Sequence, residues 1–185
     1  MSRRRIVYWL VPAHPERELF RAIIAILAQQ LQSPRFEPHL TLCSTSNDSR
    51  SPSVLGKVTG EPLRLTLTGI RWSSKYTKTL FARFRPSAQL NEFAGSLQVA
   101  AGQRKATIRD PHLSLCYKRL TPTMKKKLAQ LIRLPLRDVL FDTVCAVRCS
   151  VPTRSAADVE AWKIIARRRL KSAGSRARRP AFTVR

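Results

Sequence analysis

The sequence predicts a mixed α+β fold made of two similar lobes, and three observations lead to this prediction. First, the segment EPHLTLC at Glu37–Cys43 returns almost unchanged as DPHLSLC at Asp110–Cys116. Second, each copy has the alternation of a strand and follows a segment with helical periodicity. Third, 185 residues with 43% hydrophobic content suffice for one domain with a core, or for two small fused lobes. A duplicated lobe is the simplest explanation of a duplicated motif.

The first half of the chain has the order strand, helix, strand. Residues Arg5–Ala13 are rich in β-branched and aromatic side chains and stop at a proline, which predicts a strand. Pro15–Gln32 begins with proline and acidic residues and spaces its apolar residues at i, i+3 and i+4, as an amphipathic helix does. The motif segment Pro38–Ser44 is the next strand. A polar loop follows, with a short helix expected near Pro52–Val58.

The second half begins with a pair of strands. The segments Leu63–Trp72 and Lys78–Pro86 read as two strands across the polar turn SSKYT, and the first alternates apolar with polar residues. The stretch Ala88–Gly102 is apolar at helical spacing and ends at glycine, which predicts a helix with a glycine stop. This part therefore repeats the arrangement of a helix placed before a motif strand.

The remaining elements complete the second lobe. The motif segment Pro111–Tyr117 is a strand, and Thr121–Ile132 is a helix with its threonine as N-cap and proline at the first position. Two long strands, Leu136–Val151 and Glu160–Leu170, close the fold across a loop. We expect residues 1–170 to form a single bilobal domain of mainly antiparallel sheet, with helices outside and a central cleft.

Charge is the extreme feature of the composition. Thirty-five Lys and Arg residues against eleven acids give a net charge of +24, which attracts polyanions such as nucleic acid. Residues 171–185 are basic, contain Gly, Ser and Pro, and lack apolar periodicity, so we expect a flexible tail. Nonspecific nucleic-acid binding through the basic surface and this tail is a corresponding prediction.

The sequence contains no sign of membrane insertion or secretion. No apolar run approaches the length of a membrane span, and the N-terminal residues do not match a signal peptide. The four cysteines form no CxxC pattern, so neither a metal site nor a cofactor is expected. We expect a cytoplasmic monomer with reduced cysteines.

The two motifs carry the candidate chemistry. In a strand, side chains alternate between faces, so His39 and Thr41 share one face while the leucines beside them can face the core. The same holds for His112 and Ser114. If the lobes are related by a pseudo-two-fold axis, two imidazoles and two hydroxyls converge across one cleft. The chain has only three histidines, and two of them occupy matching positions in the repeat.

Opening of a 2′,3′-cyclic phosphate by water suits this set of groups. The reaction needs a base for the water and an acid for the departing ribose oxygen, and histidine serves both roles near neutral pH. The hydroxyls of Thr41 and Ser114 can donate hydrogen bonds to the non-bridging phosphate oxygens, where charge builds up. No metal ion is required.

The chain resembles the 2H phosphoesterase superfamily, which is named for two His-x-(Thr/Ser) motifs. It is most similar to the cyclic nucleotide phosphodiesterase branch, and the resemblance spans nearly everything but the tail. The segments that carry it are an aromatic-rich first strand, the two motif strands with their entries, and a last strand after tryptophan: Tyr8–Pro12, Pro34–Leu42, Pro111–Tyr117 and Trp162–Arg167.

The resemblance implies a metal-independent enzyme that hydrolyses 2′,3′-cyclic nucleotides or ADP-ribose 1″,2″-cyclic phosphate to the monophosphate. It makes His39 and His112 the catalytic pair and Thr41 and Ser114 the phosphate binders. We assign His112 as the base and His39 as the acid. Lys118, which follows the second motif, departs from the small residue often found there in the branch.

Three aromatic residues are further candidates for substrate binding. Trp9 and Tyr117 could stack on a base, as aromatic side chains do for unpaired nucleotides. Strand alternation places Tyr117 with the core leucines unless the strand bends, so core packing is the alternative role. Tyr76 lies on a hairpin turn that could cover the cleft, and a solvated turn is its alternative.

Two other functions remain open at this point. The high charge favours an RNA 2′,3′-cyclic phosphodiesterase or 2′-5′ RNA ligase-like enzyme that acts on RNA ends, whereas the aromatic first strand favours small nucleotides. A non-catalytic basic RNA-binding module is the alternative of another class. Retention of both histidines and both hydroxyls argues against that module.

Overall fold

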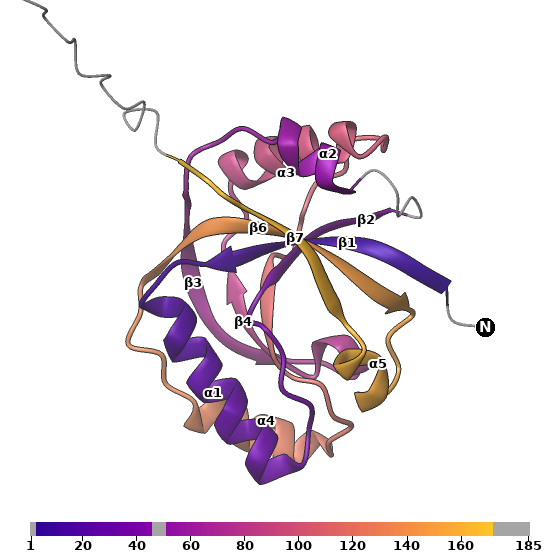
Figure 1. Ribbon diagram of the computed structural model, residues 1–185. Coiled ribbons are helices and arrows are strands. Elements are labelled where there is room, and N and C mark those ends of the chain that lie inside the picture. Colours follow the sequence, from indigo (N-terminus) through magenta and orange to yellow (C-terminus); the bar gives the residue numbers. More distant parts are fainter. Residues whose placement is uncertain (1–2, 46–50, 172–185) are drawn as a thin grey trace, which may run out of the picture.

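The computed structural model describes residues 3–45 and 51–171, so the predicted tail lies almost entirely outside the described residues. The elements follow the predicted order (Figure 1). They are β1 (Arg3–Pro12), α1 (Glu16–Leu31), β2 (Leu40–Thr45), α2 (Ser51–Lys57), β3 (Leu63–Trp72), the 3-10 helix η1 (Tyr76–Lys78), β4 (Leu80–Phe84), α3 (Ala88–Ala100), β5 (His112–Cys116), α4 (Pro122–Leu131), β6 (Asp138–Val151), α5 (Ala156–Glu160) and β7 (Lys163–Arg169).

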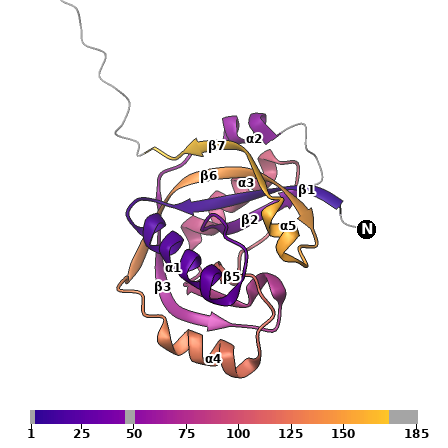
Figure 2. The ribbon, with the colours of Figure 1, turned by 60° about the horizontal axis from the view of Figure 1, so that its bottom comes forward.

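The strands form one antiparallel sheet in the order β1-β2-β5-β4-β3-β6-β7. The long strand β6 also pairs with β1, so six of these strands close on themselves and β7 is left at the margin beside β6 (Figure 2). The motif strands β2 and β5 are antiparallel neighbours that meet at the pair Leu40–Leu113. This junction and the β3–β6 pairing together divide the closed sheet into two parts, β1, β2, β6 and β7 in one and β3, β4 and β5 in the other. The predicted α+β fold of mainly antiparallel sheet is confirmed.

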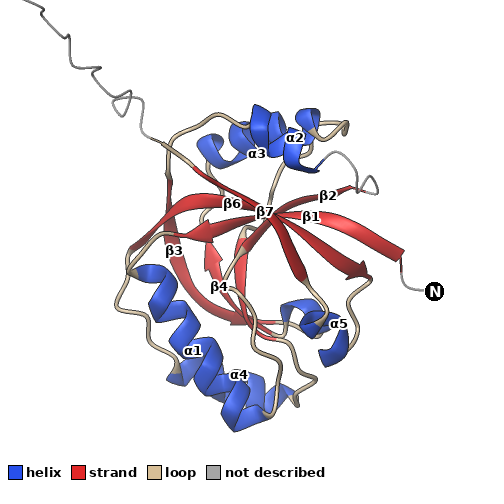
Figure 3. Ribbon diagram, in the orientation of Figure 1, coloured by secondary structure: helices blue, strands red, loops and turns tan. Residues whose placement is uncertain are grey.

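The helices cover the sheet in two groups. In Figure 3, α2 and α3 lie together on one side of the strands, and α1 and α4 lie on the other side. Helix α1 contacts β5 and β1, α4 contacts β3, and α2 contacts β7 and β6. Thr121 accepts a hydrogen bond from the Met124 amide, which confirms the predicted N-cap of α4. Among the described residues, no helix combines the length and the apolar character that crossing a bilayer requires.

Both faces of β1 are buried, which explains its nearly continuous apolar sequence. Ile6, Tyr8 and Leu10 point into the main core. The alternate residues Val7 and Trp9 belong to a second, smaller cluster on the opposite face. This cluster, called the cleft face below, consists of Val7, Trp9, Val11, Cys145, Val147 and Cys149, with Val151, Trp162 and Ile164 packed against it.

Two predicted connections contain additional helical structure. The loop expected between the last two strands holds α5, whose capping box is formed by Ser155 and Asp158. Because α5 extends to Glu160, β7 begins at Lys163 rather than at the predicted position. The polar turn between β3 and β4 likewise contains η1.

Candidate active site

The two motif histidines lie in one cavity of about 260 Å³. His39 immediately precedes β2 and His112 is the first residue of β5, and pairing of these strands brings them together. Thr41 and Ser114 line the same cavity. The structure therefore places all four predicted motif residues around one space, at the junction between the two parts of the sheet.

Each histidine uses one ring nitrogen to hold its position. The Nδ1 of His39 lies 2.7 Å from the carbonyl oxygen of Glu37, and the Nδ1 of His112 lies 2.9 Å from that of Asp110. Because a carbonyl accepts only, Nδ1 carries the hydrogen in both rings. The Nε2 atom is then the nitrogen that accepts or releases a proton during a reaction.

The acidic side chains before the histidines anchor the motif entries. Glu37 accepts hydrogen bonds from Arg17 at 2.5 Å and Arg21 at 2.7 Å. Burial raises the pKa of Glu37, but the bonds from the two arginines outweigh this effect and leave the pKa lowered. Asp110 is bound in the same manner by Lys78, and by Arg83 at 3.1 Å. Both carboxylates therefore stay charged and fix the loops whose carbonyls orient the histidines.

His39 is enclosed by aromatic rings. Its imidazole is only 5% exposed and stacks on Trp9, with ring centroids 3.7 Å apart and planes 11° apart. The ring of Trp162 meets it edge-on at 5.7 Å. Burial lowers the pKa of His39 to about 4, although the Glu37 carbonyl acts in the opposite direction. His39 is therefore neutral at pH 7.

His112 has a more polar environment. It is half-buried, and its ring meets Phe81 edge-on at 5.3 Å. Burial lowers the pKa of His112, the hydrogen bond to Asp110 raises it, and the positive charge of Lys78 lowers it further. His112 is therefore also neutral near pH 7, with a lysine close by that opposes its protonation.

The two hydroxyls differ in burial in the opposite direction to the histidines. Thr41 is exposed, whereas Ser114 is 4% exposed and donates a hydrogen bond to the Thr77 carbonyl at 3.0 Å. Burial raises the pKa of Tyr117, and a hydrogen bond with the Ser114 side chain opposes this rise. A hydroxyl has one hydrogen, so Ser114 has to release Thr77 before it can donate to a phosphate.

The aromatic candidates have different positions. Trp9 and Tyr117 line the cavity and are 3% and 4% exposed. A bulge between Tyr8 and Trp9 places Trp9 opposite Thr41 on the cleft face, where one side of its ring is covered by His39. Tyr76 does not line the cavity, but its ring centroid lies 6.2 Å from that of Tyr117.

The sequence interpretation missed other parts of the lining. Trp162 contacts the rings of Trp9 at 5.2 Å and Tyr117 at 5.3 Å, and its buried Nε1 has no hydrogen-bond partner within residues 3–45 and 51–171. Thr77 and Cys149 also line the cavity. The only signal for Trp162 was its place before the last strand in the family resemblance. Among the described residues, no three His, Cys, Asp or Glu side chains group in a way that could hold a metal ion.

Two imidazoles, each with Nδ1 held by a carbonyl, and two hydroxyls meet in one cavity, which is the arrangement expected of a two-histidine phosphoesterase. The sequence pattern of the cyclic phosphodiesterase-like protein family matches residues 5–170, and the chain belongs to this family within the 2H phosphoesterase superfamily. The protein is accordingly a cyclic phosphodiesterase. Among curated proteins, none matches the chain.

Solved structures agree with the fold. The chain is 13% identical to E. coli LigT complexed with 3′-AMP, with a TM-score of 0.58 over 93% of this chain and 100% of LigT. For E. coli LigT complexed with phosphate the identity is 12% and the TM-score 0.54, over the same shares of the two chains. A crystal structure described as a phosphoesterase is 13% identical, with a TM-score of 0.56 over 92% of this chain and 99% of its own.

Proposed function

We propose that the protein hydrolyses nucleoside 2′,3′-cyclic phosphates, or ADP-ribose 1″,2″-cyclic phosphate, to the monophosphate by metal-independent acid-base catalysis. The observation that carries this proposal is the pair of histidines in one cavity, each with Nδ1 held by a carbonyl two residues earlier. Two orientable Nε2 atoms are what in-line attack of water on a cyclic phosphate requires, one on each side of phosphorus.

In the proposed reaction, His112 is the base and His39 is the acid. Nε2 of His112 takes a proton from water as the water oxygen bonds to phosphorus. The bond from phosphorus to the ribose 3′ oxygen breaks, and Nε2 of His39 gives this oxygen its proton. The product is the 2′-monophosphate, and proton exchange with solvent restores both rings.

The surroundings of the two rings support this division of roles. Lys78 lowers the pKa of His112 and so maintains the neutral form that a base needs. Apart from burial, the group that lowers the pKa of His39 is His112 itself, and no lysine acts on it in this way. The Trp9 ring beneath His39 is a surface that attracts cations and so favours the protonated imidazole. An arriving phosphate anion raises the low pKa of His39, so the imidazolium forms with substrate bound.

The two hydroxyls are assigned to the non-bridging oxygens. Thr41 is exposed in the cavity and is ready to donate a hydrogen bond. Ser114 first exchanges its bond to Thr77 for one to phosphate, while Tyr117 supports its oxygen. Such donors are most effective where negative charge grows in the transition state.

An RNA 3′ end is the second candidate for the substrate. A cavity of about 260 Å³ is at the small end of ligand sites, so it fits a cyclic phosphate and ribose with the rest of the substrate extending outward. The net charge of +24 favours a polyanionic substrate over a mononucleotide.

The test is a turnover assay in the presence of EDTA. Purified protein is offered 2′,3′-cyclic AMP and, separately, an RNA that ends in a 2′,3′-cyclic phosphate, and the products are identified. Formation of 2′-phosphate that is lost in His39→Ala and His112→Ala protein supports the proposal, with His14→Ala as the matched control. RNA binding without turnover of either substrate would instead indicate the non-catalytic module.

A further inference from the structure

Two arginines of the marginal strand β7 lie on the same face of the sheet as the cavity. In the β6–β7 ladder, Arg167 is opposite Cys145 and Arg169 is opposite Thr143. Directly opposed residues of antiparallel strands point to the same face. Cys145 belongs to the cleft face, together with Trp9 and Cys149, which line the cavity. Arg167 and Arg169, called the arginine pair below, therefore extend the surface that starts at the active site.

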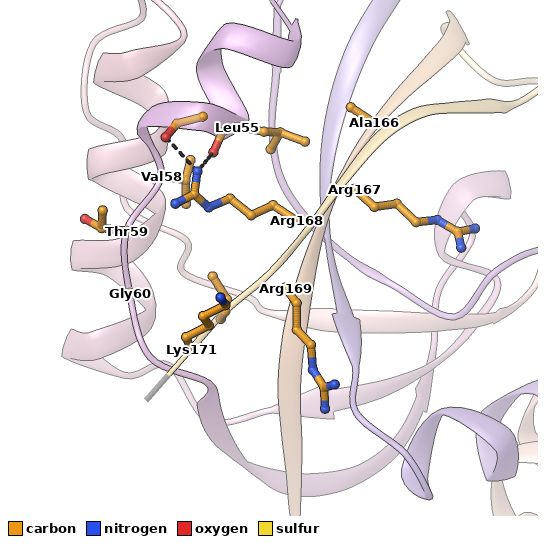
Figure 4. Close-up of a pocket in the computed structure, with 11 residues that line it drawn as sticks. Leu55, Val58, Thr59, Gly60, Ala166, Arg167, Arg168, Arg169 and Lys171 are labelled. Carbon is orange, nitrogen blue, oxygen red and sulfur yellow. Dashed lines mark hydrogen bonds between the residues drawn. The ribbon is translucent and has the colours of Figure 1, made fainter. Parts of the chain in front are cut away.

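The arginine between them has a structural role instead. The Nη1 of Arg168 donates to the carbonyls of Leu55 at 2.9 Å and Gly56 at 2.6 Å, near the C-terminal end of α2. Figure 4 shows Arg168 reaching toward α2, while Arg167 and Arg169 extend away from it. Only the arginine pair is therefore directed along the cleft face.

The arginine pair is accessible to a large anionic partner. Arg167 is exposed, and the side chain of Arg169 is 79% exposed even though its Nε lies 3.1 Å from Asp142. The Asp142 carboxylate is only 13% exposed, but it takes only the Nε of Arg169, and the other N–H groups of this exposed guanidinium can bind a phosphate. Arg169 also borders a hollow of about 770 Å³ at the end of β1, β6 and β7, whose lining contains the basic residues Arg17 and Lys171 and the acidic residues Glu18 and Asp142.

The spacing from the cavity indicates the length of the partner. Trp9 lines the cavity and lies opposite Cys145, which is opposite Arg167, so two strand spacings of about 4.8 Å separate Trp9 from Arg167. Arg169 lies two residues further along β7, or about 7 Å beyond Arg167. Stacked nucleotides advance by about 3.4 Å each, so the path from the cavity past both arginines corresponds to roughly three to five nucleotides. A short oligonucleotide is therefore long enough to bring phosphates to both arginines.

We propose that Arg167 and Arg169 bind the phosphate backbone of a single-stranded RNA whose cyclic-phosphate 3′ end occupies the histidine cavity. This inference rests on the proposed function, and it names RNA ends as the preferred substrate class. The arginines contribute affinity without reading sequence, because their partners are phosphates.

The experiment compares substrates of increasing length in the full chain. The substrates are 2′,3′-cyclic AMP and RNAs of two, four, six and about ten nucleotides that end in a 2′,3′-cyclic phosphate. For the wild-type protein, kcat/KM should rise up to about six nucleotides. For Arg167→Glu/Arg169→Glu protein, the rise should be smaller by about tenfold or more, with turnover of 2′,3′-cyclic AMP retained. The matched control, Lys126→Glu/Lys127→Glu, changes the charge equally on the exposed face of α4 and should keep the rise.

A direct binding measurement separates failure of this inference from failure of the proposed function. Fluorescence anisotropy with an RNA of about ten nucleotides and a 3′-phosphate needs no turnover. Loss of two phosphate contacts should lower the slope of log affinity against log salt by about 1.4 in the double arginine variant only. Unchanged binding and an unchanged length dependence in that variant, or equal losses in the α4 control, would overturn the proposal. Another outcome is that the wild-type protein turns over no substrate while the double arginine variant still has the lower salt slope. In that case the cyclic phosphodiesterase mechanism fails while the RNA surface stands.

Discussion

The two halves of the active site have the same motif but different surroundings. His39 is enclosed by Trp9 and Trp162, and its hydroxyl partner Thr41 is exposed. His112 is half-buried next to Lys78, and its partner Ser114 is buried and already hydrogen-bonded. The repeated motif thus supplies two histidines, and the neighbouring residues make their surroundings different. The proposed reaction, with one acid and one base, requires such a difference.

Removal of either histidine should have the largest effect and shows whether both halves are needed. His39→Ala and His112→Ala should each lower kcat by about 10²–10⁴-fold, the usual contribution of a positioned acid or base. The measurement is steady-state turnover of 2′,3′-cyclic AMP, with circular dichroism as a check of folding. Full activity in either variant would contradict the two-histidine reaction.

The burial of His39 should make the free energy of unfolding fall at acidic pH. The folded-state pKa of His39, about 4, lies below its ordinary value of 6.5, so the unfolded chain binds the proton more readily. The contribution of neutral His39 to the free energy of unfolding is complete above pH 6.5. It is lost as the pH falls toward 4, which lowers the free energy of unfolding by about 3 kcal/mol. Urea unfolding at several pH values should show this loss in the wild-type protein and not in His39→Gln. An equal loss in both proteins would show that His39 is not the responsible group.

Removal of each hydroxyl in turn should distinguish an effect on catalysis alone from an effect on both catalysis and stability. Thr41→Val should lower kcat by about 10–10²-fold with little change in unfolding free energy, because the exposed hydroxyl serves only the transition state. Ser114→Ala should lower kcat and also destabilise the protein by about 1–3 kcal/mol, since it leaves Thr77 and Tyr117 without their partner. Thermal unfolding and turnover of both variants provide the comparison, and identical profiles would remove the distinction between the halves.

Lys78 should have the smallest effect, and only on one limb of the pH profile. Its positive charge lowers the pKa of His112, so Lys78→Met should raise that pKa. In His39→Ala protein, where His112 alone titrates, the acidic limb of the residual kcat/KM should therefore move to higher pH when Lys78→Met is added. The matched variant Arg21→Met, on the Glu37 side, should leave this limb in place. A shift in the opposite direction would contradict the role given to Lys78.

The features of the molecule that depend on local sequence pattern could be predicted. Alternation and helical periodicity located the strands and helices, and the repeat pointed to the two histidines and two hydroxyls that line one cavity, whose catalytic role stays a prediction. The short helix α5 was missed, although Ser155 and Asp158 have capping-box spacing, because the segment is too short to show periodicity.

The neighbours that distinguish the halves depend on long-range pairing and could not be predicted. Trp162 meets Trp9 only because β6 lies between β1 and β7. The stacking of Trp9 on His39 follows a bulge that strand alternation does not reveal. The bond from Ser114 to Thr77 likewise requires β5 to lie beside η1.

The assignment of acid and base is tested most directly by the pH dependence of residual activity in the two single-histidine variants. His39→Ala retains the base alone, so its residual kcat/KM should rise with pH to a plateau as His112 becomes neutral. His112→Ala retains the acid alone, so its residual kcat/KM should fall as the pH rises and His39 loses its proton. The reverse pair of profiles would contradict the central claim that the surroundings make His112 the base and His39 the acid.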